Sequence, residues 1–256
     1  MSKYLGDNRL RHRIVFERDT FMRCVYCGNM AETREHVPSK VFLQTPYPND
    51  LPTVPSCEEC NNGFSSDELY TAVLLELLKN YRQNYYILNK KTHKRLERKE
   101  GKQAQNAFES YLLHPSSLFD DFKIKRVLQK LAICHAVYEV SEGYHGDAWE
   151  SNVQGIEFKL LPYMTQDEYE DMDSFEVMTL LPEVGSLGHE RIAVFEITSL
   201  TQESDLPQKT ILPFATWYEV QDGYYRYLTV VDNTSILVKI IIGEFLFTEV
   251  WFKDQK

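Results

Sequence analysis

Four of the five cysteines form two pairs with the spacing of metal ligands. Cys24 and Cys27 make the first pair, Cys57 and Cys60 make the second, and 29 residues lie between the pairs. Two C-x2-C knuckles supply four thiolates, which is the ligand set of a tetrahedral structural zinc site. In a reducing compartment, paired cysteines are often metal ligands. The spacing therefore predicts one zinc site. Two disulfides or unrelated thiols are the alternative.

Each pair is followed by residues that tolerate a tight turn. Gly28 comes after the first pair, and Asn61, Asn62 and Gly63 come after the second. Glycine and asparagine accept the positive φ angle that a backbone adopts when it turns tightly around a metal ion. These residues add to the prediction of two metal-binding knuckles.

An acid and a histidine stand side by side between the knuckles. They are Glu35 and His36, and Val37 and Pro38 follow them. An imidazole can take a proton from water near neutral pH, and a carboxylate can hold a divalent cation against a phosphate oxygen. The segment is therefore a candidate hydrolytic site. The alternative is that Glu35 is an exposed surface acid and that His36 is a packing residue.

The order of these residues resembles the HNH nuclease family, also called ββα-metal or His-Me finger endonucleases. It is most similar to the four-cysteine zinc branch, which includes phage resolvases of the endonuclease VII type. That branch places an acid-histidine pair between two C-x2-C knuckles and an asparagine directly after the last cysteine, as Glu35, His36 and Asn61 stand here. The resemblance covers residues 21–70.

This resemblance implies a metal-dependent endonuclease that hydrolyses phosphodiester bonds of nucleic acid, which we expect to be DNA. It implies His36 as the general base, Glu35 and Asn61 as ligands of a catalytic Mg²⁺ or Mn²⁺ ion, and a structural Zn²⁺ ion on the four cysteines. The family more often has Asp at the position of Glu35. Asn49 and Asn62 are alternative amide ligands, because many members carry a further Asn before the second knuckle and the start of the next helix can shift by one residue.

The charge of the chain is divided unevenly. The whole chain carries −10, but residues 1–100 hold 16 basic and 13 acidic residues, so the remaining 156 residues carry −13. Binding to phosphates needs local positive charge. Residues 79–99 hold eight basic residues and one acid. From this segment we expect contacts to nucleic acid by Lys90, Lys91, Lys94 and Arg95, with an ordinary charged surface as the alternative.

Two helices are predicted in the first 144 residues. A capping box of Ser65 and Glu68 marks the start of the first, and Asp120 can cap the second, which carries an apolar stripe over residues 124–138. His135 falls on this stripe and is expected as a core residue, as is the thiol of Cys134. Residues 89–107 show no apolar face, so they are expected to form a solvated loop or linker.

After Gly143 the pattern changes to strands. Six short runs are rich in β-branched and aromatic residues and are separated by Gly, Pro, Asp and Asn. The runs are residues 155–161, 175–181, 191–198, 224–231, 236–242 and 245–251. The acidic segment 167–173 is expected as a loop or short helix. The sequence thus predicts an α+β fold with a zinc-stapled ββα-metal finger (1–88), a helical connector (89–144) and a β-rich domain (145–256).

No stretch of the sequence suits a membrane. The longest apolar run, residues 235–247, is interrupted and too short for a bilayer, and the first twenty residues lack the apolar core of a signal peptide. We therefore expect a cytoplasmic protein with no membrane partner. A partner protein or a homo-oligomer stays open.

Two other functions fit the sequence. The knuckles could form a non-catalytic zinc module that binds nucleic acid or protein. Alternatively, the acidic β-rich domain could sense a ligand or partner and control the nuclease, an arrangement that would suit a bacterial defence effector.

Overall fold

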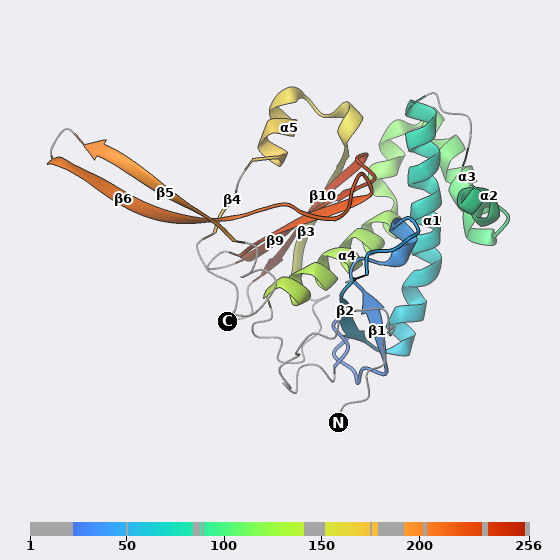
Figure 1. The fold of residues 1–256 in the computed structure, drawn as a ribbon. Helices are drawn as coiled ribbons and strands as arrows, with labels where there is room; N and C mark the ends of the chain where they lie inside the picture. Colours follow the sequence, from blue (N-terminus) through green and yellow to red (C-terminus); the bar gives the residue numbers. More distant parts are fainter. Residues whose placement is uncertain are drawn as a thin grey trace.

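The computed structural model combines helices and sheets, so the predicted α+β class is confirmed. It describes residues 23–49, 51–83, 88, 90–140, 152–174, 176–178, 192–201, 204–231 and 235–253. Figure 1 shows a small hairpin beside the long helix α1, a second helix α4 behind them, and a larger sheet on the far side of α4. The hairpin and α1 carry the candidate site.

The hairpin pairs two short antiparallel strands. They are β1 (Thr33–His36) and β2 (Thr53–Ser56), with the 3-10 turn η2 (Lys40–Phe42) in the loop between them. The register sets Glu35 opposite Val54 and His36 opposite Thr53. The candidate acid and histidine therefore lie at the end of a strand, directly before the loop.

Helix α1 (Glu58–Arg82) begins seven residues earlier than the predicted capping box at Ser65. Cys57 is the N-cap, and its sulfur accepts a hydrogen bond from the backbone N–H of Cys60. Glu58 and Glu59 occupy the first turn, where negative charge is favourable. The helix therefore includes residues 61–63, which the sequence analysis placed in a turn, and the Ser65 hydroxyl donates to the Asn62 carbonyl instead of capping.

The predicted loop at residues 89–107 is wrong, because this segment forms two helices. They are α2 (Lys90–Leu96) and α3 (Lys99–Leu113), and α3 packs against α1. The Lys, Arg, Glu, Gln and Ala residues that suggested a solvated loop are also strong helix formers. Gly101 permits the tight junction, because a Cβ atom there would lie 2.1 Å from the carbonyl oxygen of Arg95.

Helix α4 (Phe122–Val140) is buried on all sides over residues 130–136, whereas Phe122 at its start is exposed. It follows the 3-10 turn η3 (Pro115–Asp120), and Asp121, one residue after the predicted cap, accepts hydrogen bonds from the N–H groups of Lys123 and Ile124. The expected core positions are confirmed: Cys134 and His135 are fully buried. A helix that is buried all round lies between two layers, and α4 contacts both α1 and the large sheet.

The large sheet is antiparallel, with the order β3-β10-β9-β8-β7. Its strands are β3 (Val153–Leu160), β7 (Tyr218–Gln221), β8 (Tyr225–Val231), β9 (Ser235–Ile242) and β10 (Leu246–Lys253). Four of the predicted runs correspond to β3, β8, β9 and β10. Helix α4 packs on one face, and α5 (Gln166–Met172) covers the other after the turn η5 (Leu161–Tyr163), as Figure 1 shows.

A second sheet has three strands in the order β4-β6-β5. These are β4 (Glu176–Val177), β5 (Ala193–Thr201) and β6 (Ser204–Ala215), and Figure 1 shows β5 and β6 extending away from the other described elements. Strands β6 and β7 were not predicted. Strand β6 contains two prolines, which argue against a central strand. Part of the predicted run 175–181 lies outside the described residues.

Among the described segments, buried side chains form one main cluster that extends from the first knuckle to the large sheet. It includes Tyr26 of the first knuckle, Leu74 of α1, Leu131 of α4 and Val238 of β9. The domain boundaries at residues 88 and 144 stay a prediction. Helix α4 has buried contacts both with α1 and with the large sheet. None of the described helices has the length and apolar composition needed to cross a membrane.

Candidate metal centre and hydrolytic site

The four cysteines of the two pairs come together at the base of α1. Their sulfur atoms all lie within 4.8 Å of one another, and the Sγ atoms of Cys27 and Cys57 are 3.7 Å apart. Four sulfurs about 2.3 Å from a zinc ion in a tetrahedron would be separated by about 3.8 Å. All five cysteines of the chain are free thiols. The cluster can hold a zinc ion, and the disulfide alternative is not supported.

Backbone geometry builds the first knuckle. The carbonyl of Cys24 accepts the N–H of Gly28 at 2.9 Å, and Gly28 has a φ angle of 74°, the positive value that the sequence predicted. The N–H of Val25 donates to the carbonyl of Pro55 at 3.1 Å, which fastens the knuckle to β2. The second knuckle is the first turn of α1, so one half of the cluster is a turn and the other half is a helix N-terminus.

Glu35 points into the protein. Neighbouring residues of a strand face opposite sides, so Thr33 and Glu35 share the face toward α1, whereas Arg34 and His36 share the other. The side chain of Glu35 is 9% exposed. The alternative of an exposed surface acid is therefore wrong.

Three other buried side chains surround Glu35, and together the four residues form the Glu35 cluster: Glu35, Ser39, Glu68 and Lys130. The Lys130 Nζ atom lies 3.3 Å from Oε2 of Glu35 and makes a closer ion pair with Glu68. The Ser39 hydroxyl accepts from Lys130 at 2.8 Å, donates to Glu68 at 2.5 Å and lies 3.3 Å from Oε1 of Glu35. Four segments thus meet at one buried polar site.

Burial and charge act in opposite directions inside the Glu35 cluster. Burial raises the pKa of Glu35; Lys130 opposes this, and the negative charge of Glu68 adds to it. Burial alone would lower the pKa of Lys130, but Glu68 and Glu35 outweigh it, so the pKa of Lys130 is raised. Lys130 is therefore a cation at neutral pH. With both carboxylates ionised, the cluster carries one excess negative charge, which a low-dielectric interior disfavours unless a cation balances it.

Asn61 lies where the first turn of α1 packs against strand β1, the strand that carries Glu35. It is in the first turn of α1 and half-buried, and its Nδ2 donates to the Thr33 hydroxyl at 3.1 Å. Thr33 shares a face of β1 with Glu35, so both candidate metal ligands lie between β1 and α1. The alternative amides, Asn49 and Asn62, are exposed.

His36 lies at the end of β1, next to Glu35 but on the opposite face of the strand. The residue is half-buried, and its Nε2 atom is shielded from solvent. The structure therefore places His36 directly after Glu35 in β1, but its side chain faces the other side of the strand from Glu35.

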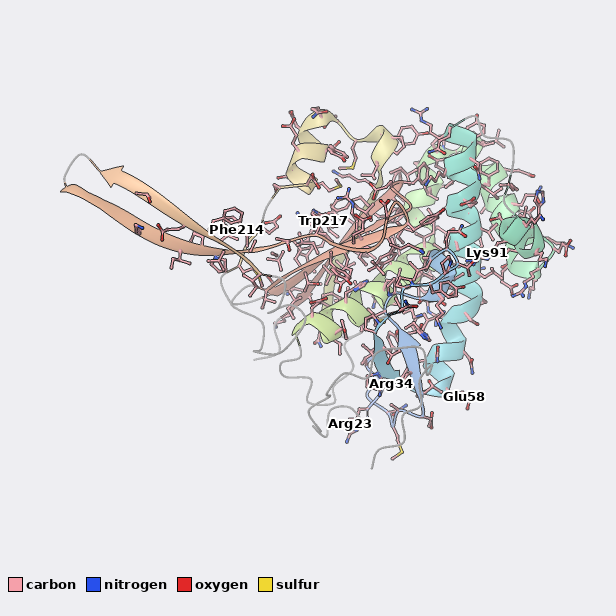
Figure 2. The ribbon with its side chains drawn as sticks, in the orientation of Figure 1. Arg23, Arg34, Glu58, Lys91, Phe214 and Trp217 are labelled. Carbon is pink, nitrogen blue, oxygen red and sulfur yellow. The ribbon has the colours of Figure 1, made fainter. Side chains whose placement is uncertain are left out.

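The four predicted phosphate-binding residues divide into two pairs. Lys91 and Arg95 donate to the carbonyls of Leu43 at 2.7 Å and Val41 at 3.0 Å, and burial lowers the pKa of each. These two residues hold the loop between β1 and β2. Lys90 and Lys94 are exposed. Figure 2 shows Lys91 beside the upper half of α1, away from Arg34 and Glu58 at the lower end.

Three members of the Glu35 cluster were not predicted as site residues. Ser39 was not considered, Glu68 was assigned to a capping box, and Lys130 lies in a mostly apolar stretch, residues 127–140. A lysine within a mostly apolar run of a helix is a usable signal, because a buried cation needs a buried acid as its partner.

Comparisons with protein-family models, with curated proteins and with solved structures found no match for this chain.

Proposed function

We propose that the protein is a metal-dependent endonuclease of the HNH type that hydrolyses phosphodiester bonds of nucleic acid, with DNA as the expected substrate. The observation that carries this proposal is the buried carboxylate of Glu35 at the end of β1, with Asn61 of α1 bonded to Thr33 on the same face of that strand. The four-cysteine cluster at the base of the same helix supports it. The order strand, strand, helix is the one that the resemblance implies.

The donor atoms suit a hard divalent cation. Glu35 offers carboxylate oxygens and Asn61 an amide oxygen, and Mg²⁺ and Mn²⁺ prefer oxygen ligands. The excess negative charge of the Glu35 cluster also favours a cation. When bound, such an ion supplies the Lewis acid that stabilises negative charge on the phosphate oxygens. The four cysteines would hold a separate, structural zinc ion.

His36 would act as the general base. The imidazole would take the proton from the attacking water. His36 directly follows Glu35 in β1, so the same strand holds the base and the ligand, on opposite faces.

The test is cleavage of plasmid DNA with added Mg²⁺ by the wild type and by His36→Ala. Loss of a general base should slow cleavage by about 10²- to 10⁴-fold. His93→Ala is the matched control, because His93 is an exposed histidine of α2. If zinc-loaded, folded wild type cleaves neither DNA nor RNA, or if His36→Ala cleaves at the wild-type rate, the proposal is wrong.

Glu35→Ala separates the ligand from the base. Added Mg²⁺ or Mn²⁺ should recover part of its activity, because a weakened ion site can be filled at higher concentration, whereas added metal cannot replace the missing base in His36→Ala. Equal metal dependence in both variants would contradict the assigned roles.

A non-catalytic zinc module is the second candidate. The ion pair with Lys130 favours it, because it engages the proposed ligand Glu35, and so does the shielding of His36 Nε2, because it closes one imidazole nitrogen to water. Nucleic-acid binding by the wild type, with no cleavage in any divalent metal, would support this alternative.

A further inference from the structure

Two neighbouring ion pairs join α1 to α4. Asp67 pairs with Arg126 at 2.6 Å, and the next residue, Glu68, pairs with Lys130, one turn further along α4. Both acids are 8% exposed. The first pair extends to the backbone, because Arg126 also donates to the carbonyl of Gly63. The second pair extends to Glu35.

The distances rank the partners of Lys130. Its Nζ atom is closer to Glu68 than to Glu35, where the separation is 3.3 Å. Coulomb energy falls with distance, so Glu68 balances most of the charge of the ammonium group. Lys130 can therefore orient Glu35 while Glu35 keeps negative charge for another cation.

We infer that Lys130 and Glu68 are positioning residues for the proposed catalytic ion: Lys130 orients the Glu35 carboxylate, and Glu68 prevents Lys130 from neutralising it. The inference rests on the proposed function. Groups that hydrogen-bond to metal-ligating carboxylates orient them, and loss of such a group typically weakens metal binding by about 10- to 100-fold. Neither residue touches the ion or the substrate.

This arrangement makes the site dependent on α4. Lys130 is 1% exposed, and α4 packs against β8, β9 and β10. Further along the same helix, Cys134 contacts the hydroxyl of Tyr26 in the first knuckle at 2.9 Å, and His135 contacts the hydroxyl of Tyr225 in β8 at 2.8 Å. The sheet therefore helps to place a residue that acts on Glu35, although that residue lies 95 positions later in the chain.

The test measures Mn²⁺ binding by electron paramagnetic resonance in full-length, zinc-loaded protein. Glu68→Gln keeps the shape of the side chain and leaves Lys130 paired with Glu35, so the variant has no unbalanced buried charge and should fold. We expect its Mn²⁺ affinity to fall by at least about tenfold, because Lys130 then neutralises the ligand. Asp67→Asn is the matched control, since it removes the same charge from the neighbouring ion pair, and its affinity should be unchanged.

A double variant tests whether Lys130 and Glu68 act on the ion site or only stabilise the fold. Adding Lys130→Met to Glu68→Gln removes the cation that neutralises Glu35, so Mn²⁺ affinity should recover in part relative to Glu68→Gln. It should stay below that of the wild type, because Glu35 also loses the group that orients it. Unchanged affinity in Glu68→Gln, an equal fall in Asp67→Asn, or a double variant no better than Glu68→Gln would each overturn the inference and leave the proposed function standing. A wild type that binds no Mn²⁺ would overturn both.

Discussion

The four-cysteine cluster and the Glu35 cluster are neighbours on α1, but they are assembled differently. The cysteines occur as two close pairs within residues 24–60, whereas Glu35 meets Lys130 from a helix much later in the chain. The first cluster gains stability from the ion that it can bind. The second confines two carboxylates and one ammonium group away from water, which opposes folding unless the charges are matched. The four-cysteine cluster would therefore stabilise the protein, whereas the Glu35 cluster would serve the proposed reaction.

The largest effect should come from breaking the cysteine cluster. Cys57→Ser should lose bound zinc and the structure of the hairpin and knuckles, because structural zinc sites of this kind supply about 10–16 kcal/mol of apparent binding free energy. Elemental analysis and circular dichroism measure the two losses. Cys134→Ser is the matched control, since Cys134 is a buried free thiol outside the cluster; equal zinc loss in both variants, or none in Cys57→Ser, would contradict the zinc site.

Removing the cation from the Glu35 cluster should have the next largest effect. Lys130→Met leaves two buried carboxylates without their partner, which should lower the free energy of unfolding by about 3–5 kcal/mol. Urea denaturation at pH 7 measures the change. Arg126→Met is the comparison, because Arg126 is one-third exposed and its loss should cost less. Equal destabilisation in both variants would mean that the burial of Lys130 is unimportant.

Glu35→Gln should change stability in the opposite direction. Because the pKa of Glu35 is raised in the folded protein, its ionised form is less favourable there than in the unfolded chain. The wild type should therefore lose stability as pH rises from about the usual glutamate pKa of 4.5 through the raised value. Glu35→Gln lacks this loss, so it should unfold at higher urea than the wild type at pH 7, without added Mg²⁺, and show no difference in acid. A destabilised variant at pH 7 would show that the carboxylate contributes to folding.

The smallest effects concern the basic residues of α2. Replacing Lys90 and Lys94 together with alanine should reduce the slope of log binding constant against log salt concentration by about one for each phosphate contact that is lost. The urea midpoint of unfolding should not change. Alanine at Lys91 and Arg95 should instead lower stability, by about 0.5–1.5 kcal/mol for each hydrogen bond to the loop. Salt-dependent binding and urea denaturation separate the two pairs. An unchanged salt slope for Lys90 and Lys94 would move the binding surface elsewhere.

Local patterns predicted individual elements well where a single interaction controls them. Most strands of the large sheet, the buried face of α4 and the positive φ angle of Gly28 follow from alternation, periodicity and the freedom of glycine. The errors occurred where two local signals competed. Ser65 and Glu68 match a capping box, but the sulfur of Cys57 caps α1 earlier, and residues 89–107 lack an apolar face although their helix propensity is high.

The sequence by itself determined the four-cysteine cluster and the neighbouring positions of Glu35 and His36. A C-x2-C pair brings two thiols together through its own turn, and adjacent residues stay adjacent in any fold. Only the tertiary structure decided that Glu35 is buried, that it faces Lys130 and Glu68, and that Lys91 and Arg95 hold a loop. These contacts join segments far apart in the sequence, and they depend on how α4 packs between α1 and the sheet, which no local spacing encodes.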